Sequence, residues 1–181
     1  RGPERAKVSI VVFSDFMCEQ CKRVSKYFDI VAANHRDDLR IAYVNYPSDR
    51  ACNPNSDQTL HPGACVLARA AACARRQGRF WEFHDAVFAD PEPVAPEKLP
   101  RYADRAGLAA PALEACIAEG DSAIGLASEI ALAKSLGVHA TPTSFINGRS
   151  VVGALKPWML EAAIGVLAKL PASAPAPAPP Q

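Results

Sequence analysis

Apolar positions near the start of the chain follow two different spacings, and the change between them predicts the first elements. Residues 8–13 form a short, β-branched apolar run, which is typical of a strand buried on both faces. From residue 24 the apolar positions recur every three or four residues, which predicts a helix that continues to about Asn34. Residues 40–46 predict a second strand. This order predicts a βαβ unit with a right-handed crossover.

The middle of the chain is predicted to be a loop followed by a block of helices. Residues 47–62 are rich in Asn, Asp, Ser and Pro, which is the composition of a loop. Helical spacing then appears at residues 64–76, 80–89, 97–106, 112–119 and 122–136. Pro111 suits a helix start and Gly137 a helix end, which supports the last two of these helices.

The last part of the chain predicts a hairpin and a closing helix. Residues 143–146 and 149–152 are strand-like runs separated by Asn147-Gly148, a pair that supplies the positive φ angles of a type I′ turn. Residues 157–170 have the pattern of a helix. The whole chain therefore predicts an α/β protein with a mixed sheet between helices and a helical insertion.

Charge and composition exclude several classes of partner. The formal net charge is +1 and no run of five or more Lys or Arg occurs, so no nucleic acid or membrane-surface partner is expected. No apolar stretch is long enough to span a bilayer, and the first residues have no signal-peptide core. Since the chain also lacks an initiator Met, we interpret it as a mature or excised fragment without its targeting segment.

Residues 171–181 contain only Pro, Ala, Ser and a final Gln, a composition that cannot form a packed core. Such a segment is either an extended linker that tethers the protein to a membrane or a second domain, or a frayed C-terminus.

The cysteines introduce candidate chemistry. Six is an even and high number, which favours an oxidising compartment over a cytosolic metal or redox protein. Cys18 and Cys21 lie at the predicted helix start, close enough to bridge, and the helix N-terminus offers positive dipole to the first sulfur. CxxC thiols in such settings have pKa values of roughly 3.5 to 7.5, against about 8.5 for a free thiol.

Cys18 is therefore the candidate attacking thiol, and Cys21 is the candidate resolving thiol. A lone CxxC also fits half of a zinc site or a structural bridge. The strand before it and the helix after it favour the redox interpretation.

Three stretches carry a family resemblance: Phe13 to Lys22 around the CxxC, Gly78 to Asp85 in the helical block, and Leu136 to Gly148 through the hairpin. Their order and spacing resemble the DsbA-like branch of the thioredoxin superfamily, a thioredoxin fold with a helical insertion. The likeness covers residues 7–170.

The resemblance implies a division of the chain and a location. Residues 1–47 and 121–170 would form the thioredoxin-fold domain, residues 48–120 the helical insertion, and residues 171–181 the tail or linker. The implied location is extracytoplasmic, in the bacterial periplasm.

The resemblance also implies site residues. Cys18 and Cys21 are the catalytic pair, and Thr141-Pro142 is a cis peptide bond whose loop faces the CxxC and pairs with an extended substrate segment. From the residues alone a trans bond is expected, because only about 5–6% of X-Pro bonds in folded proteins are cis. The intervening Glu19 and Gln20 complete the active-site loop.

Two departures from the family pattern predict a milder oxidant than DsbA itself. Val12 stands six residues before Cys18, where family members often carry a buried carboxylate. Glu19-Gln20 lacks the His of strongly oxidising relatives and places a negative charge beside the thiolate, which Lys22 and Arg23 only partly offset. We expect a potential well below the value of about −120 mV that is typical of DsbA.

The other four cysteines predict two structural disulfides. Cys65 and Cys73 lie eight residues apart on one predicted helix, about 12 Å along its axis, so they cannot bridge. The simplest pairing joins Cys52 to Cys65 and Cys73 to Cys116. An alternative is that the first of these pairs exchanges and relays electrons to Cys18.

The histidines offer weaker candidates. A zinc site made of Cys52, His61, Cys65 and one more thiol is conceivable by ligand type, but its spacing matches no familiar finger, so no metal is expected. No cofactor is expected either. His84 is predicted to be a hydrogen-bonded structural residue of its helix. His139, three residues before Pro142, is expected on an exposed loop, with an approach to the active site as the alternative, and His35 has no argument for function.

The leading functional hypothesis is an enzyme that oxidises cysteine-containing substrate proteins. A membrane redox partner, DsbB-like or vitamin-K-epoxide-reductase-like, would regenerate its disulfide. A disulfide reductase or isomerase is the second hypothesis, because the direction depends on potential and partner. A binding or chaperone module whose CxxC is only a bridge is the third.

Overall fold

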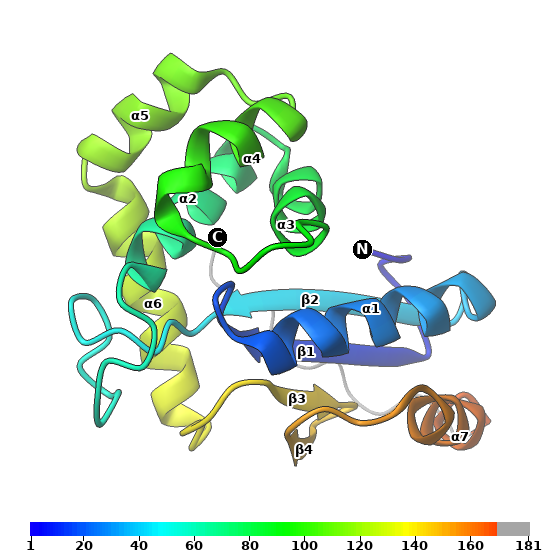
Figure 1. The fold of residues 1–181 in the computed structure, drawn as a ribbon. Helices are drawn as coiled ribbons and strands as arrows, with labels where there is room; N and C mark the ends of the chain where they lie inside the picture. The colour runs from blue at the N-terminus through cyan, green and yellow to red at the C-terminus, as the bar shows by residue number, and fades with distance from the viewer. Residues whose placement is uncertain (170–181) are drawn as a thin grey trace. The chain divides into compact units, whose positions relative to one another are not determined.

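The computed structural model describes residues 1–169, which form four strands, seven α-helices and one short 3-10 helix (Figure 1). In chain order these elements are β1 (Val8–Ser14), α1 (Glu19–Asn34), β2 (Leu39–Asn45), α2 (Ala64–Arg76), α3 (Phe80–Phe88), η1 (Pro96–Lys98), α4 (Leu99–Arg105), α5 (Ala110–Ala118), α6 (Asp121–Ser135), β3 (Thr143–Ile146), β4 (Arg149–Val152) and α7 (Pro157–Leu167). The predicted α/β class is confirmed. The tail 171–181 lies outside the described residues.

The four strands form one mixed sheet in the order β2-β1-β3-β4. β1 pairs antiparallel with β3, with Phe13 opposite Thr143, and β3 pairs antiparallel with β4. β1 and β2 run in the same direction, joined through the crossover helix α1 (Figure 1). The strand predicted to be buried on both faces is therefore a central strand, and its apolar run explains that place.

Among the described residues, 1–14, 19–44 and 140–169 form the first of two compact units, built from the sheet with α1 and α7. Its interior combines Ile10 and Phe13 of β1 with Val24 of α1 and Ile164 of α7, all almost inaccessible to solvent. The ring of Phe13 meets that of Phe145 edge to face, 5.7 Å between centroids. Burial of these apolar side chains stabilises the strands and helices that the spacing of apolar positions predicts.

Residues 15–18 and 45–139 form the second unit, which contains helices α2 to α6. Its largest fully buried side chains are Tyr102, Phe83, Leu67 and Leu126. The Tyr102 hydroxyl donates to the buried carboxylate of Asp90 at 3.0 Å, which satisfies both groups. The limits suggested by the family resemblance, 48–120 for the insertion, remain a proposal.

Two local features test the turn chemistry read from the sequence. Asn147 and Gly148 have φ angles of 46° and 82°, as the predicted hairpin turn requires. The single helix predicted over 97–106 was wrong, because the structure has a 3-10 turn followed by α4. Pro100 has no N–H and lies in the first turn of α4, where an amide donor is not needed.

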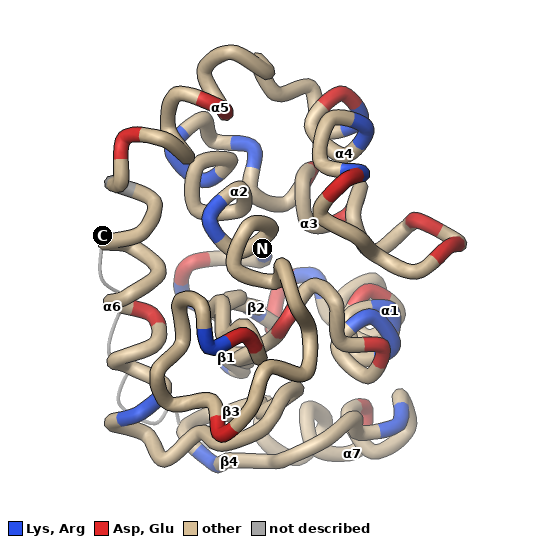
Figure 2. Tube along the Cα trace, turned by 60° about the vertical axis from the view of Figure 1, so that its left-hand side comes forward, with Lys and Arg blue, Asp and Glu red and all other residues tan. Residues whose placement is uncertain are grey.

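Charges of both signs mix along the trace of each unit, for example on α1 and α4 (Figure 2). Within residues 1–169, no helix combines the length and apolar character needed to cross a bilayer.

Candidate active site

The CxxC lies where the sequence predicts it, at the start of a helix. Cys18 directly precedes α1 and Cys21 lies in its first turn, and both are thiols in the structure. Cys18 is 8% exposed and Cys21 is inaccessible, whereas the intervening Glu19 and Gln20 are exposed. Cys18 is therefore the less deeply buried residue of the pair and has the favourable position at the positive end of the helix dipole.

Asp15 forms the turn that presents Cys18. Its main-chain carbonyl accepts the Cys18 amide at 3.1 Å, and its Oδ1 accepts the Met17 amide at 2.8 Å. An Asp that bonds to the backbone two residues onward is a common turn former, which explains the local break between β1 and α1.

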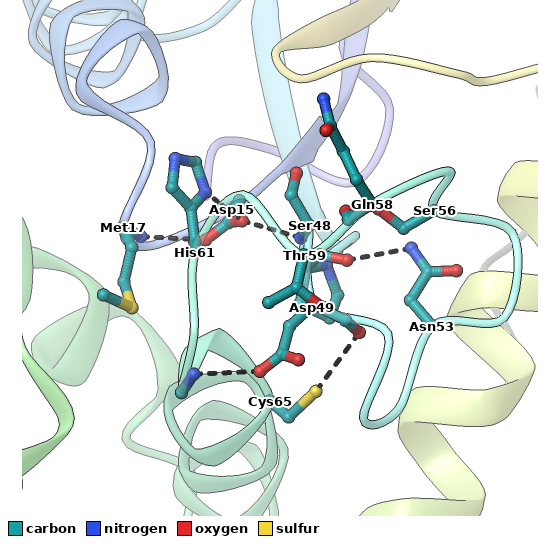
Figure 3. A network of polar contacts seen from close by, with 12 residues as sticks. Asp15, Met17, Ser48, Asp49, Asn53, Ser56, Gln58, Thr59, His61 and Cys65 are labelled. Atoms are coloured by element: carbon teal, nitrogen blue, oxygen red, sulfur yellow. Dashed lines mark hydrogen bonds and ion pairs between the residues drawn. The ribbon is translucent and has the colours of Figure 1, made fainter.

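The Asp15 carboxylate is also the buried acid that the sequence did not reveal. Its side chain is 0% exposed, and Oδ2 accepts both the Ser48 amide at 2.8 Å and His61 Nδ1 at 2.7 Å (Figure 3). The family pattern directed attention to Val12, which is buried and apolar. A carboxylate is present three residues before Cys18 instead, and the signal that could have found it is an Asp placed between a buried strand and a CxxC.

His61 completes an ion pair with Asp15. The hydrogen bond to Asp15 raises the pKa of His61 above its ordinary 6.5, burial opposes the rise, and the charges of Asp15 and Cys18 add to it. The imidazole therefore stays cationic to higher pH than an exposed histidine.

The loop between β2 and α2 holds His61 in place through several bonds (Figure 3). The Ser48 carbonyl accepts the amides of Leu60 and His61, at 2.9 and 3.1 Å. Asp49 accepts the Gly63 amide at 2.9 Å, and Asn53 donates to the Pro47 carbonyl at 2.8 Å.

A disulfide between Cys52 and Cys65 closes this loop, and a second joins Cys73 of α2 to Cys116 of α5. Both have the predicted pairing. Because the first disulfide consumes two thiolates, the zinc site considered from the sequence loses the ligands that it would need. That both disulfides are structural, rather than the Cys52–Cys65 pair exchanging with Cys18, remains a prediction.

Aromatic packing anchors the residue after Asp15. The ring of Phe16 meets those of Phe83 and Phe88 of α3, with centroids 5.8 and 5.3 Å apart. His84 of α3 is buried beside the same ring and pairs with Asp85 at 2.8 Å, which agrees with the hydrogen-bonded role expected for it.

The Thr141-Pro142 peptide bond is cis, the isomer that the family resemblance implies. Pro142 is buried, and its carbonyl accepts the Gly153 amide at 2.8 Å. That this loop faces the CxxC and binds substrate backbone remains a proposal. His139 is exposed, as expected.

A family model described as Thioredoxin matches residues 1–165. The chain belongs to the thioredoxin family. Solved thioredoxin-like structures share its fold. The thioredoxin-like oxidoreductase of Silicibacter pomeroyi DSS-3 is 24% identical, with a TM-score of 0.78 over 94% of this chain and 92% of that one.

Oxidised BdbD of Bacillus subtilis is 21% identical to this thioredoxin-family chain, with a TM-score of 0.77 over 93% and 91% of the two chains. The thiol-disulfide exchange protein alpha-DsbA2 of Wolbachia pipientis is 18% identical, with a TM-score of 0.72 over 92% and 84%.

Curated relatives carry a segment similar to this thioredoxin-family chain within much longer proteins. The Na(+)/H(+) antiporter NhaA of Herminiimonas arsenicoxydans is 34% identical over 156 residues, which are 84% of this chain and 23% of the relative. The Na(+)/H(+) antiporter NhaA 3 of Salinispora tropica is 33% identical over 163 residues, 90% and 23%. The chain spans about a quarter of the length of these relatives.

Proposed function

We propose that this chain is a thiol-disulfide oxidoreductase that forms disulfides in cysteine-containing substrate proteins through Cys18 and Cys21. The observation that carries the proposal is the asymmetry of the pair: Cys18, which precedes the first turn of α1, keeps 8% of its surface exposed, whereas Cys21 within that turn is wholly buried. Such an arrangement favours attack at the first sulfur and resolution by the second.

The reaction exchanges one disulfide for another. A substrate thiolate attacks the Cys18 sulfur of the Cys18–Cys21 disulfide, a mixed disulfide forms, and Cys21 leaves as a thiolate. A second substrate thiolate then attacks the substrate sulfur of the mixed disulfide and releases Cys18 as a thiolate. The two substrate thiolates lose two electrons in total and the CxxC gains them, and any protons lost by the substrate thiols or taken up by the cysteine thiolates exchange with solvent.

We propose an extracytoplasmic location, such as a bacterial periplasm. The two disulfides of the helical unit support it, because such bonds persist in oxidising compartments. A fold neighbour from Salmonella enterica serovar Typhimurium, 19% identical with a TM-score of 0.67, is described as a periplasmic thioredoxin-like protein.

A membrane redox partner, DsbB-like or vitamin-K-epoxide-reductase-like, would return the CxxC to its disulfide. We also propose that the chain operates tethered to a membrane protein, which the similarity to one segment of antiporters supports. Ion transport itself is not proposed for this chain.

A redox equilibrium of the pair in glutathione buffers, combined with alkylation of the remaining thiols, tests the direction. We expect a potential between those typical of DsbA, about −120 mV, and thioredoxin, about −270 mV. We also expect the disulfide form to oxidise a reduced, unfolded protein catalytically, with the Cys18→Ser variant inactive and Cys21→Ser trapping the mixed disulfide.

Other outcomes point to the other hypotheses. A potential near that of thioredoxin, with activity only when the pair is reduced, assigns the chain to reductases or isomerases. Unchanged activity of Cys18→Ser assigns it to binding or chaperone modules.

A further inference from the structure

We propose that His61, held by the buried carboxylate of Asp15, is a positioning residue that stabilises the Cys18 thiolate and thereby makes the CxxC more oxidising. This inference rests on the proposed function, because it concerns the same thiol. It assigns a role to two residues that the CxxC itself does not include.

Little positive charge lies within the CxxC itself. Glu19 and Gln20 supply none, and the Glu19 carboxylate disfavours a neighbouring thiolate. The helix dipole at the start of α1 and the charges of Lys22 and Arg23, which follow the motif, act in the opposite direction. A further cation held close to Cys18 would add to this stabilisation.

Asp15 contacts both His61 and Cys18, the first through its side chain and the second through its main chain. The main-chain carbonyl accepts the Cys18 amide, and the side chain accepts His61 Nδ1 at 2.7 Å. The same residue therefore positions both the imidazole and Cys18. Nδ1 is engaged by the carboxylate, which leaves Nε2 on the opposite side of the ring (Figure 3).

The imidazole is also fixed before any thiolate forms. The His61 main-chain amide donates to the Ser48 carbonyl, the Ser48 amide donates to the Asp15 carboxylate, and the Cys52–Cys65 disulfide closes the segment that contains His61. A charge held in this way does not need to reorganise when the thiolate appears, which makes its stabilisation more effective.

Electrostatic coupling between the two groups is reciprocal. Among the described residues, the groups whose charges raise the pKa of His61 are Asp15 and Cys18, and burial opposes them. If the thiolate favours the imidazolium, the imidazolium must favour the thiolate by the same free energy. Because the thiolate exists only in the reduced pair, its stabilisation makes the disulfide a stronger oxidant.

The experiment compares His61→Gln with a matched control, His35→Gln. The His35 ring also pairs with a carboxylate, that of Glu161, at 2.6 Å, but in the other unit. The readouts are the pH dependence of Cys18 alkylation and the glutathione equilibrium of the pair. We expect His61→Gln to raise the Cys18 pKa and to stabilise the disulfide about tenfold, or about 30 mV, and His35→Gln to change neither.

A second measurement avoids any loss of folding in the variant. NMR titration of the wild-type protein should give a higher pKa for His61 in the reduced form than in the disulfide form. A purely structural His61 would lower stability without producing this difference. Equal His61 pKa values in the two forms would overturn the proposal, as would equal effects of the two glutamine variants on Cys18.

These readouts are independent of substrate turnover. If the chain fails to oxidise proteins while His61→Gln still shifts the Cys18 pKa, only the proposed function fails. If turnover is present and the titrations do not respond to His61, only this inference fails.

Discussion

Two histidine–carboxylate pairs of nearly equal length occupy very different surroundings. His61 meets Asp15 at 2.7 Å and His35 meets Glu161 at 2.6 Å, and the two rings are similarly accessible, at 25% and 23%. The carboxylates differ: Asp15 is 0% exposed, whereas Glu161 is 33% exposed. Distance alone therefore says little about such a pair, because solvent on the carboxylate side screens one and not the other.

The partners of the two carboxylates differ as well. Asp15 accepts two backbone amides besides His61, and thus organises a turn and a loop. Glu161 accepts hydrogen bonds from two side chains, those of Asn34 and His35, and these hydrogen bonds lower the pKa of Glu161. We expect the Asp15–His61 pair to hold the turn and the loop together, and the Glu161–His35 pair to be a surface contact between α7 and the end of α1.

The largest expected effect comes from removing each carboxylate. Asp15→Ala should lower the free energy of unfolding by about 3–5 kcal/mol, because it removes a buried carboxylate and leaves two part-buried amides and a part-buried cation without their acceptor. Glu161→Ala should cost less than about 1 kcal/mol, since water replaces the lost acceptor. Urea unfolding of both variants measures the difference, and equal losses would contradict the contrast.

The next largest effect is expected from removing the disulfide that closes the loop with His61. The Cys52→Ser/Cys65→Ser variant should lose about 3 kcal/mol of stability, the chain-entropy value for a loop of about 14 residues. It should also raise the Cys18 pKa, because His61 is no longer fixed. The control is Cys73→Ser/Cys116→Ser, which should cost about 4 kcal/mol for its longer loop and leave the Cys18 pKa unchanged.

The two pairs should respond to opposite ends of the pH scale. The pKa of His61 is raised in the folded state. Its contribution to the free energy of unfolding is therefore complete below the ordinary pKa of 6.5 and is lost as the pH rises through the pKa of the folded state. The pKa of Glu161 is lowered, so its contribution is present above the ordinary 4.5 and is lost as pH falls through the folded value.

Urea midpoints measured between pH 3 and pH 9 test this assignment. His61→Gln should remove the decline above pH 6.5, and Glu161→Gln should remove part of the decline below pH 4.5. A decline above pH 6.5 that persists in His61→Gln would assign it to another group.

Salt should produce the smallest difference. Exposed pairs are screened at high ionic strength, so the stability difference between wild type and Glu161→Gln, about 0.5 kcal/mol or less, should vanish in 1 M sodium chloride. The effect of Asp15→Asn should persist, because no solvent reaches that carboxylate. Parallel urea titrations at low and high salt provide the measurement.

Much of the fold could be predicted because local patterns determine it. The run at 8–13, the Asn147-Gly148 turn and the helix after the CxxC are short-range signals, and the structure contains the corresponding elements. Helix geometry excludes a bridge between Cys65 and Cys73, because two cysteines eight residues apart on one helix cannot meet. Of the pairings that remain, the simplest is the one predicted and the one present in the structure.

The Asp15–His61 pair could not be predicted in the same way. The two residues are 46 positions apart, and the loop that brings them together has no periodicity to analyse. In the sequence, His61 is a candidate only for a zinc site whose spacing matches no familiar finger, and no pattern links it to Asp15. The fold of the loop brings its ring to the carboxylate beside the CxxC.

Residues 15–18 belong to the compact unit of the helices although they lie between β1 and α1 in the chain. Phe16 packs among the rings of α3, and Asp15 bonds to the loop before α2. A protein engineer who grafts residues 45–139 onto another thioredoxin scaffold would leave this four-residue segment behind. The transplanted helices would then lack the Phe16 ring that packs against α3 and the Asp15 carboxylate that accepts a hydrogen bond from the loop before α2. A functional chimera must therefore exchange residues 15–18 and 45–139 together.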